Sequence, residues 1–546
     1  TLFPYTTLFR SIIKSVSVNT HEFVIERPLV SFYPSASEQS LLSVQLTRQK
    51  DSYLIKFTNG SKDTVTLGDV IPLGRDKGNH DEEGHVFIGS HGNDRLARTH
   101  LFLPSRDPVG VIVPDNAWDL GYASLKINDT LSVYALTRRK SETAVHTKLK
   151  RFEAILSPGG SISFEMHVET FKGSWQEGLR KCFQERLLYD IPSIDETLYN
   201  REDLRWIRKA YVMHLMMAWD KDFYDAKTGG FQLKPFLEKG KKYYGGDDVI
   251  CIWPTWPTLG LDQRNQFDLY RDLPGGLPAL RKLADTLRSH GTKFFIAYNP
   301  WDESTRTEGH LQGLAHLIKE TTADGVVLDT KGESSRELQQ AADQVRPGVI
   351  MYSEGMAVPR DMPGIVSGRV HNALYYPPLL NLNKFIRPDF AIFRVAEIYL
   401  EPIRREYALS MFNGYGTEIN QFRPGHPNWV EADYRFWGQT LRVLRENAAV
   451  FSQKQYVPLW PSQRDSIYIN QWPGAEKTLF TLFSLQPAGY KGPLFETPVK
   501  MGYHLVDLWN HEELKPSEKN GKWVVSADLE AFSQKWLGTN NEGAVG

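Results

Sequence analysis

Two acidic residues stand directly after apolar runs, in an arrangement that suits catalysis by paired carboxyl groups. Asp329 ends the run VVLD, and Glu354 ends VIMYSE one helix-length segment later. If both runs are neighbouring strands of a parallel sheet, about 4.8 Å apart, the two carboxyl groups lie within roughly 5–6 Å of each other. Retaining glycoside hydrolysis uses such a pair: one carboxylate attacks the anomeric carbon, and the other protonates the leaving oxygen and later activates water.

The same two acids could instead cap helices or hold loops. Asp329 is followed by Thr330 and Lys331, and Glu354 is followed by Gly355, so neither directly precedes a helix. Capping is therefore the less natural role. The negative charge of either carboxylate favours the protonated form of the other, which is what a general acid needs near neutral pH.

Residues 203–452 carry the elements that must position these acids. Short apolar runs alternate there with amphipathic helical segments, which predicts a closed (β/α)8 TIM barrel. The expected strands are YVMHLMMAWD, VICIWP, TKFFIAY, GVVLD and VIMYS, with weaker candidates at GRVHNALYY, FAIFRV and YALSMFNGYG. The expected helices are LPALRKLADTLRSHG, EGHLQGLAHLIKETTA, SSRELQQAADQVRPG and EADYRFWGQTLRVLRENAAVF.

The ends of the first four predicted strands supply further polar and aromatic residues. In a parallel barrel the functional side chains gather at the carboxyl ends of the strands. We therefore expect substrate-binding side chains among a set that could equally fill core or loop positions. The set is Trp219, Asp220, Trp253, Trp256, Trp301, Asp302 and Lys331.

β-Rich segments flank the barrel region. Residues 12–172 alternate apolar and polar side chains between turn signals, which predicts an N-terminal antiparallel β-sandwich. Residues 173–202 read as a linking helix, and residues 453–546 as a small C-terminal β-sandwich. The fold class is therefore multidomain, with a central barrel between two β-domains.

The composition excludes several classes of function. The net charge of −1 across 546 residues gives no basic face for nucleic acid, and no apolar run approaches the roughly 20 residues needed to span a bilayer. Two cysteines form no disulfide framework, and the histidines show no metal-ligand spacing. The acidic pair Asp247–Asp248 precedes its strand, so we interpret it as a turn at the far face. We expect no cofactor and no catalytic metal.

The barrel motifs resemble those of retaining α-glycosidases. DGVVLD, followed one unit later by a strand ending in Glu, is similar to the nucleophile and acid/base strands of the α-amylase family and of endo-α-N-acetylgalactosaminidase-like hydrolases. The order of domains also resembles α-galactosidases and α-glucosidases. The resemblance implies a retaining mechanism on an α-linked carbohydrate, with Asp329 as nucleophile and Glu354 as acid/base.

The resemblance has departures that leave the exact family open. Val327 stands where the α-amylase family has Arg, and the segment FAIFRVAEIYLEP lacks that family's His-Asp pair. The α-galactosidase and α-glucosidase families take their acid from the sixth strand, where this chain has His371 and Asn372. If the strand count shifts by one, Glu354 binds substrate and the acid is Glu397 or Glu418.

Two other classes of protein remain as alternatives. One is a non-catalytic carbohydrate-binding protein, and the other is a metal-dependent barrel enzyme. The loop LGLDQRNQFDLYRDLPGG is rich in Asp and Arg, and it either forms a lid or holds itself by ion pairs. The oligomeric state is left open.

The opening segment, TLFPYTTLFRS, resembles translated sequencing-adaptor DNA of the kind found in assembled environmental sequence. We interpret residues 1–11 as an artefact that replaces the natural N-terminus and any signal peptide. Localisation therefore stays open, with secretion or the periplasm as the expectation.

Overall fold

The computed structural model divides the chain into two compact units. One comprises Thr1–Pro192 with Tyr376–Ile386, and the other comprises Ser193–Tyr375 with Arg387–Gly546. The structure describes residues 12–18, 21–28, 30–34, 41–73, 84–89, 100–112, 120–150, 153–184, 195–257, 263–302, 304, 307–331, 336–355, 361–370, 380–382, 387–399, 402–420, 427–530 and 544–545. The opening segment, residues 1–11, lies outside these ranges.

The first unit is built mainly from antiparallel strands, as the alternating pattern predicts, although β21 pairs with β9 in parallel. An 11-stranded sheet runs in the order β21-β9-β8-β7-β10-β11-β12-β5-β4, with β6 pairing both β12 and β3, and β1 and β2 form a separate pair. Whether the sheet closes face to face as a sandwich stays a prediction. The bounds are β1 Ile12–Val18, β2 His21–Pro28, β3 Val30–Pro34, β4 Leu42–Arg48, β5 Tyr53–Asn59, β6 Val65–Pro72, β7 His85–Gly89, β8 His100–Phe102, β9 Val109–Ile112, β10 Leu120–Asn128, β11 Leu131–Leu149, β12 Ala154–Phe171 and β21 Leu380–Asn381.

The predicted linking helix is present as α1 (Trp175–Gln184), which packs on β10 and β11 through buried Leu179, Cys182 and Phe183. The predicted helical segment runs past the end of α1, and residues 185–194 lie outside the described residues. In the second unit, α2 (Thr197–Asn200) and the short helix η3 (Glu202–Lys209) lead into the barrel.

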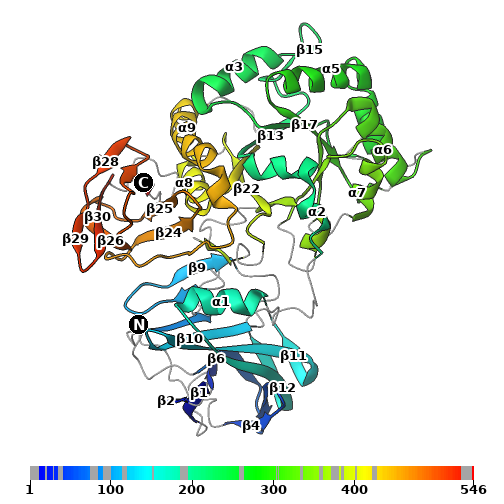
Figure 1. Cartoon of the computed structure of the whole chain (residues 1–546). Coiled ribbons are helices and arrows are strands. Elements are labelled where there is room, and N and C mark those ends of the chain that lie inside the picture. Colours follow the sequence, from blue (N-terminus) through cyan, green and yellow to red (C-terminus); the bar gives the residue numbers. More distant parts are fainter. Residues whose placement is uncertain are drawn as a thin grey trace. The chain divides into compact units, whose positions relative to one another are not determined.

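The second unit contains the predicted barrel. Eight strands form a closed barrel in the order β13-β16-β17-β18-β19-β20-β22-β23, every neighbour parallel (Figure 1). The first five predicted strands therefore take barrel positions one to five. The bounds are β13 Val212–Met217, β16 Val249–Trp253, β17 Lys293–Tyr298, β18 Gly325–Leu328, β19 Ile350–Ser353, β20 Ser367–Val370, β22 Ala391–Glu397 and β23 Gly416–Asn420.

Helices cover the outside of this barrel (Figure 1). The four predicted helices are present as α5, α6, α7 and α9, the last followed by the short α10. The bounds are α3 Leu233–Tyr244, α4 Gln266–Arg271, α5 Gly276–Ser289, α6 His310–Thr321, α7 Arg336–Asp343, η4 Met362–Gly364, α8 Arg404–Asn413, α9 Val430–Glu446 and α10 Ala448–Phe451, and a small hairpin joins β14 (Tyr224–Asp225) to β15 (Gly230–Phe231).

One predicted strand is wrong. YALSMFNGYG forms most of helix α8, and the eighth strand, β23, follows it. The reason is burial: the α8 residues from Glu406 to Asn413 are all buried, and the helix packs on both the barrel strands and β25. A helix enclosed on every side shows no amphipathic period, so its apolar run resembles a buried strand.

The C-terminal strands belong to the same compact unit as the barrel. The strands predicted here from SIYINQWP, KTLFTLFSLQ, HLVDLWN and KWVVSADL correspond to β24, β25, β27 and β30. Apolar side chains of β24, β25, β26 and β30 share one core. The pattern missed β26, whose Gly492 and Pro493 argue against a strand. The bounds are β24 Ile467–Pro473, β25 Thr478–Ser484, β26 Tyr490–Pro498, β27 Leu505–Asp507, β28 Glu512–Leu514, β29 Ser517–Lys519, β30 Lys522–Leu529 and β31 Ala544–Val545.

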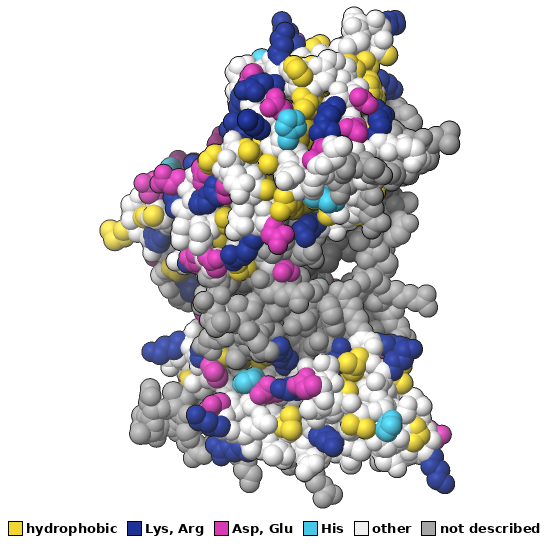
Figure 2. Space-filling model, turned by 90° about the vertical axis from the view of Figure 1, so that its right-hand side faces the viewer, with side chains coloured by type: hydrophobic (Ala, Val, Ile, Leu, Met, Phe, Trp, Pro, Cys, Tyr) yellow, Lys and Arg dark blue, Asp and Glu magenta, His cyan; other side chains and the backbone are white. Residues whose placement is uncertain are grey.

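Charges of both signs are interspersed over the described surface on the face drawn in Figure 2. This mixture agrees with the net charge of −1. Within the described ranges, none of the helices combines the length and the apolar character needed to cross a bilayer.

Candidate active site

Asp329 and Glu354 stand side by side at the carboxyl ends of two neighbouring barrel strands. Leu328, the last residue of β18, is the register partner of Ser353, the last residue of β19. The two acids are the next residue on each strand. The carboxyl ends of barrel strands form the face where enzymes of this fold carry their active sites.

The Asp329 carboxylate is buried and held through one oxygen. Its Oδ2 accepts hydrogen bonds from Asn299 Nδ2 (3.0 Å) and Trp301 Nε1 (3.2 Å), both from the loop after β17. Burial, and next to it the charge of Glu354, raises the pKa of Asp329 to about 6. The sequence did not predict a functional role for Asn299.

The Glu354 carboxylate is held from two sides. Arg369 Nη2 donates to Oε1 at 2.6 Å, and the backbone N–H of Thr330 donates to Oε2. Arg369 Nε also donates to the backbone carbonyl of Glu354 at 3.1 Å. Thr330 has a φ of 56°, which is rare for a β-branched residue, so the turn after Asp329 is strained where its N–H meets Glu354.

Charged and polar side chains fill the barrel interior next to this pair. Arg369 Nη1 donates to Glu418 Oε1 at 2.7 Å, and the Tyr352 hydroxyl donates to Glu418 Oε2 at 2.7 Å. Glu418 is fully buried, as is nearly all of Arg369. Sequence reasoning had no signal for Arg369, because its partners come from β19 and β23.

The alternative acids from the late strands differ in their surroundings. Glu418 lies inside the barrel with both oxygens engaged by Arg369 and Tyr352. Glu397 is the last residue of β22 and is partly exposed. His371 and Asn372 lie outside the described residues.

The four predicted tryptophans near the strand ends differ in exposure: two are accessible to solvent, one is partly buried and one is buried. Trp301 is 38% exposed and also contacts Asp329, while Trp219 is 50% exposed and packs edge-on against Tyr224. Trp253 is only 2% exposed, which favours its core alternative over a sugar platform. Trp256 is partly buried and packs against Trp253 with ring centroids 5.8 Å apart.

The predicted polar binding residues, Asp302, Asp220 and Lys331, also differ in their burial and in their contacts. Asp302 is buried, and its carboxylate accepts the N–H groups of Gln266 and Ser304, both at 3.0 Å, so its contacts match the loop alternative. Asp220 is partly exposed, with Oδ1 accepting the N–H of Asp222 at 2.8 Å. Lys331 is partly buried, and its carbonyl accepts the N–H of Glu354 at 3.1 Å.

The Asp- and Arg-rich segment after β16 is partly helical. Asn265 caps α4 by accepting the N–H groups of Phe267 and Asp268, a signal that its sequence position could have given. Ion pairs hold the segment, as the structural alternative expects: Arg271 pairs with Asp268 and with Glu308, and Arg264 pairs with Asp272. The start of this segment, including Asp262, lies outside the described residues.

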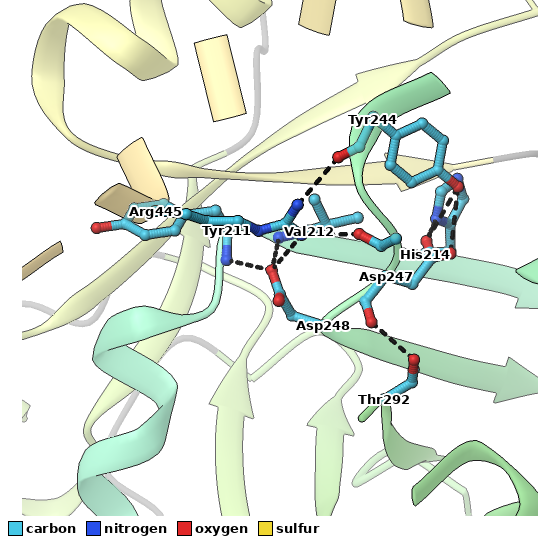
Figure 3. Close-up of polar contacts among 9 residues, drawn as sticks. Tyr211, Val212, His214, Tyr244, Asp247, Asp248, Thr292 and Arg445 are labelled. Atoms are coloured by element: carbon cyan, nitrogen blue, oxygen red, sulfur yellow. Dashed lines mark hydrogen bonds and ion pairs between the residues drawn. The ribbon is translucent and has the colours of Figure 1, made fainter. Parts of the chain in front are cut away.

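Asp247 and Asp248 precede β16, as predicted, and their oxygens meet protein donors (Figure 3). Asp248 Oδ2 accepts the N–H groups of Tyr211 (2.8 Å) and Val212 (2.9 Å) and pairs with Arg445 of α9 at 3.1 Å. The contacts tie the start of β13 to helix α9. The groups shown in Figure 3 therefore brace the barrel.

The other acid of this pair serves the same end of the barrel. Asp247 bonds to buried His214, to the Tyr244 hydroxyl and, through its carbonyl, to Thr292. Among the described residues, no three His, Cys, Asp or Glu side chains gather as metal ligands would.

The bracing role of Asp248 predicts a loss of stability without a loss of chemistry. Asp248→Ala should lower the free energy of unfolding by about 2–3 kcal/mol, because two backbone donors and a charged Arg445 lose their acceptor. Urea unfolding followed by circular dichroism measures the change. Asp285→Ala, which removes an exposed acid on α5, is the matched control. Equal stability of both variants would contradict the bracing role.

Comparisons with known proteins find distant structural likeness only. No family model matches the chain, and no curated protein matches it. An α-amylase from Geobacillus thermoleovorans in complex with acarbose is 11% identical over 62% of this chain and 98% of its own, with a TM-score of 0.41. A cyclomaltodextrinase is 11% identical over 90% of this chain and 98% of its own, with a TM-score of 0.42.

The galactosidase domain of an α-galactosidase-sucrose kinase, AgaSK, is also 11% identical, over 91% of this chain and 81% of its own, with a TM-score of 0.43. At these identities and TM-scores, none of the three activities can be transferred to this chain. The function has to be argued from the residues at the ends of β18 and β19.

Proposed function

We propose that this protein is a retaining glycoside hydrolase that cleaves an α-glycosidic bond, with Asp329 as nucleophile and Glu354 as general acid/base. The observation that carries the proposal is the pair of carboxyl groups at neighbouring strand ends, with Asp329 held by Asn299 and Trp301 and Glu354 held by Arg369. Two carboxyl groups with different surroundings are what the double displacement requires. The preference for an α-linkage comes from the resemblance of the two motifs.

The first step forms a covalent intermediate. Asn299 and Trp301 both hold Oδ2 of Asp329, so Oδ1 is the oxygen that attacks the anomeric carbon. The bond from that carbon to the glycosidic oxygen breaks, and Glu354 gives its proton to the departing oxygen. The product is a glycosyl ester on Asp329.

The second step releases the sugar. Glu354, now a carboxylate, takes a proton from water as the water oxygen attacks the anomeric carbon. The ester bond to Asp329 breaks, so Asp329 is again a carboxylate and Glu354 is again protonated. Two inversions give a product with the anomeric configuration of the substrate.

The substrate side of the proposal uses the aromatic residues near the strand ends. Trp301 and Trp219 present exposed rings, which suit the C–H faces of a sugar. Asp220, Trp256 and Lys331 are proposed to help in binding. Trp253 and Asp302 are proposed to support their loops, because both are buried.

The raised pKa of Asp329 sets the acid limit of activity. A nucleophile must be ionised, so kcat/KM should fall about tenfold per pH unit below a pKa of about 6. The measurement is kcat/KM for an aryl glycoside across pH 4–9. If kcat/KM instead falls as the pH rises through about 6, the protonated form of Asp329 is the active one, and the two roles are reversed.

The experiment that tests the proposal is a panel of aryl α- and β-glycosides of glucose, galactose, N-acetylgalactosamine and fucose. Release of aryl alcohol from one α-glycoside supports the proposal and names the sugar. The anomer of the first sugar formed, read by NMR, tests retention. Release from a β-glycoside alone would contradict the α-linkage, and a first product of opposite configuration would contradict the double displacement.

A further inference from the structure

Two charged side chains in the barrel interior, Arg369 and Glu418, have no role in the proposed chemistry. TIM-barrel interiors are usually filled by layers of branched apolar side chains. Here Glu418 is fully buried and pairs with Arg369, which is almost as buried and also pairs with the partly buried Glu354. Burying charge is costly unless the charges pair, so the arrangement calls for a function.

Arg369 is shared between two carboxylates. Its Nη2 donates to Glu354 Oε1 at 2.6 Å, and its Nη1 donates to Glu418 Oε1 at 2.7 Å. Tyr352 fixes the far side of Glu418 by donating to Oε2. The contacts connect β19, β20 and β23 and end at the proposed general acid.

We propose that Glu418 is a positioning residue that, by neutralising Arg369, keeps Glu354 able to carry the proton for the leaving group. The proposal rests on the proposed function of Glu354. Without Glu418, the charge of Arg369 would favour the ionised form of Glu354, and an ionised Glu354 has no proton to give to the leaving group. Paired with Glu418, Arg369 still orients Glu354 through two directed hydrogen bonds, but its charge is largely cancelled.

Within the described part of the chain, charged groups reach Glu354 from several barrel strands. Asp329 approaches from β18 and Arg369 from β20, with Glu418 behind it on β23. Tyr352 and Cys251 are neutral, because burial raises the pKa of each well above its ordinary value. Lys331, in the loop after β18, is present in every variant below, so its contribution cancels from the comparison.

The test is the position of the alkaline limb of kcat/KM against pH. In Glu418→Gln, the charge of Arg369 is no longer countered by Glu418, so it stabilises the carboxylate of Glu354 more strongly and the limb should move down by roughly one pH unit. Glu406→Gln is the matched control, because Glu406 forms a buried ion pair with Arg394 outside the site. Its limb should stay in place. A uniform loss of activity in Glu418→Gln, with an unmoved limb, would overturn the proposal.

A double variant guards against a simple folding defect. Arg369→Met with Glu418→Gln removes both charges and leaves none buried without a partner. Glu354 then keeps the charge of Asp329 beside it without that of Arg369, so the alkaline limb should lie above that of Glu418→Gln alone. Limbs at the same pH in the single and the double variant would overturn the proposal.

A titration separates this inference from the proposed function. The ¹³C carboxyl signal of Glu354, assigned by its loss in Glu354→Gln, can be followed by NMR without any substrate. It should titrate at lower pH in Glu418→Gln than in the natural sequence. If no aryl glycoside is cleaved, the proposed function is wrong. If Glu354 titrates at the same pH in Glu418→Gln as in the natural sequence, the positioning role of Glu418 is wrong.

Discussion

Asp329→Asn should lower kcat/KM on the cleaved aryl glycoside by on the order of 10⁴-fold or more, since an amide cannot form the glycosyl ester. Asn keeps the size of the side chain, and its carbonyl oxygen can still accept from Asn299 and Trp301, so the fold should persist. Steady-state kinetics measure the loss. Asp285→Asn, an equal change on the surface of α5, should be neutral.

Azide rescue distinguishes a lost nucleophile from a disturbed site. In Asp329→Gly, azide can enter the space of the missing carboxylate and attack the anomeric carbon of an activated α-glycoside. One displacement inverts that carbon, so the expected product is a β-glycosyl azide. Full activity of Asp329→Asn would contradict the placement of Asp329 in the active site. An α-glycosyl azide from Asp329→Gly would contradict its role as nucleophile.

Glu354→Gln should have an effect that depends on the leaving group. General acid catalysis contributes about 10²–10⁴-fold, and that much should be lost for a poor leaving group that needs the proton. A nitrophenolate needs little help, so its departure should be largely spared. Rates for a series of aryl glycosides with rising phenol pKa measure the difference.

The control for this variant is Glu238→Gln, an exposed change on α3. In Glu354→Gln, azide should intercept the glycosyl ester on Asp329 and give an α-glycosyl azide after two inversions. An equal loss for good and poor leaving groups would show that Glu354 positions the substrate rather than donating a proton.

The sequence predicted the parts of the site that lie along one strand each. VVLD and VIMYSE carry a buried run and then an acid, and the run and its end are local features. Their adjacency followed from the expected barrel order, which the register of Leu328 with Ser353 confirms. Local pattern and one topological rule were therefore enough for this pair.

Contacts across the barrel could not be predicted in this way. Arg369 of β20 contacts Glu354, which follows β19, and Glu418 of β23. No spacing along the sequence predicts either contact. Trp253 lies at a strand end, as predicted. The sequence could not predict that its ring is buried, because burial depends on neighbours such as Trp256. Long-range packing decided both cases.

The most direct test of the central claim is to trap the glycosyl ester. A 5-fluoroglycosyl fluoride of the sugar found with the aryl glycosides slows the second step more than the first, so the ester accumulates. Mass spectrometry of the digested protein should find the sugar on the peptide that contains Asp329. A label on Glu354, or turnover with no labelled peptide, would contradict the account.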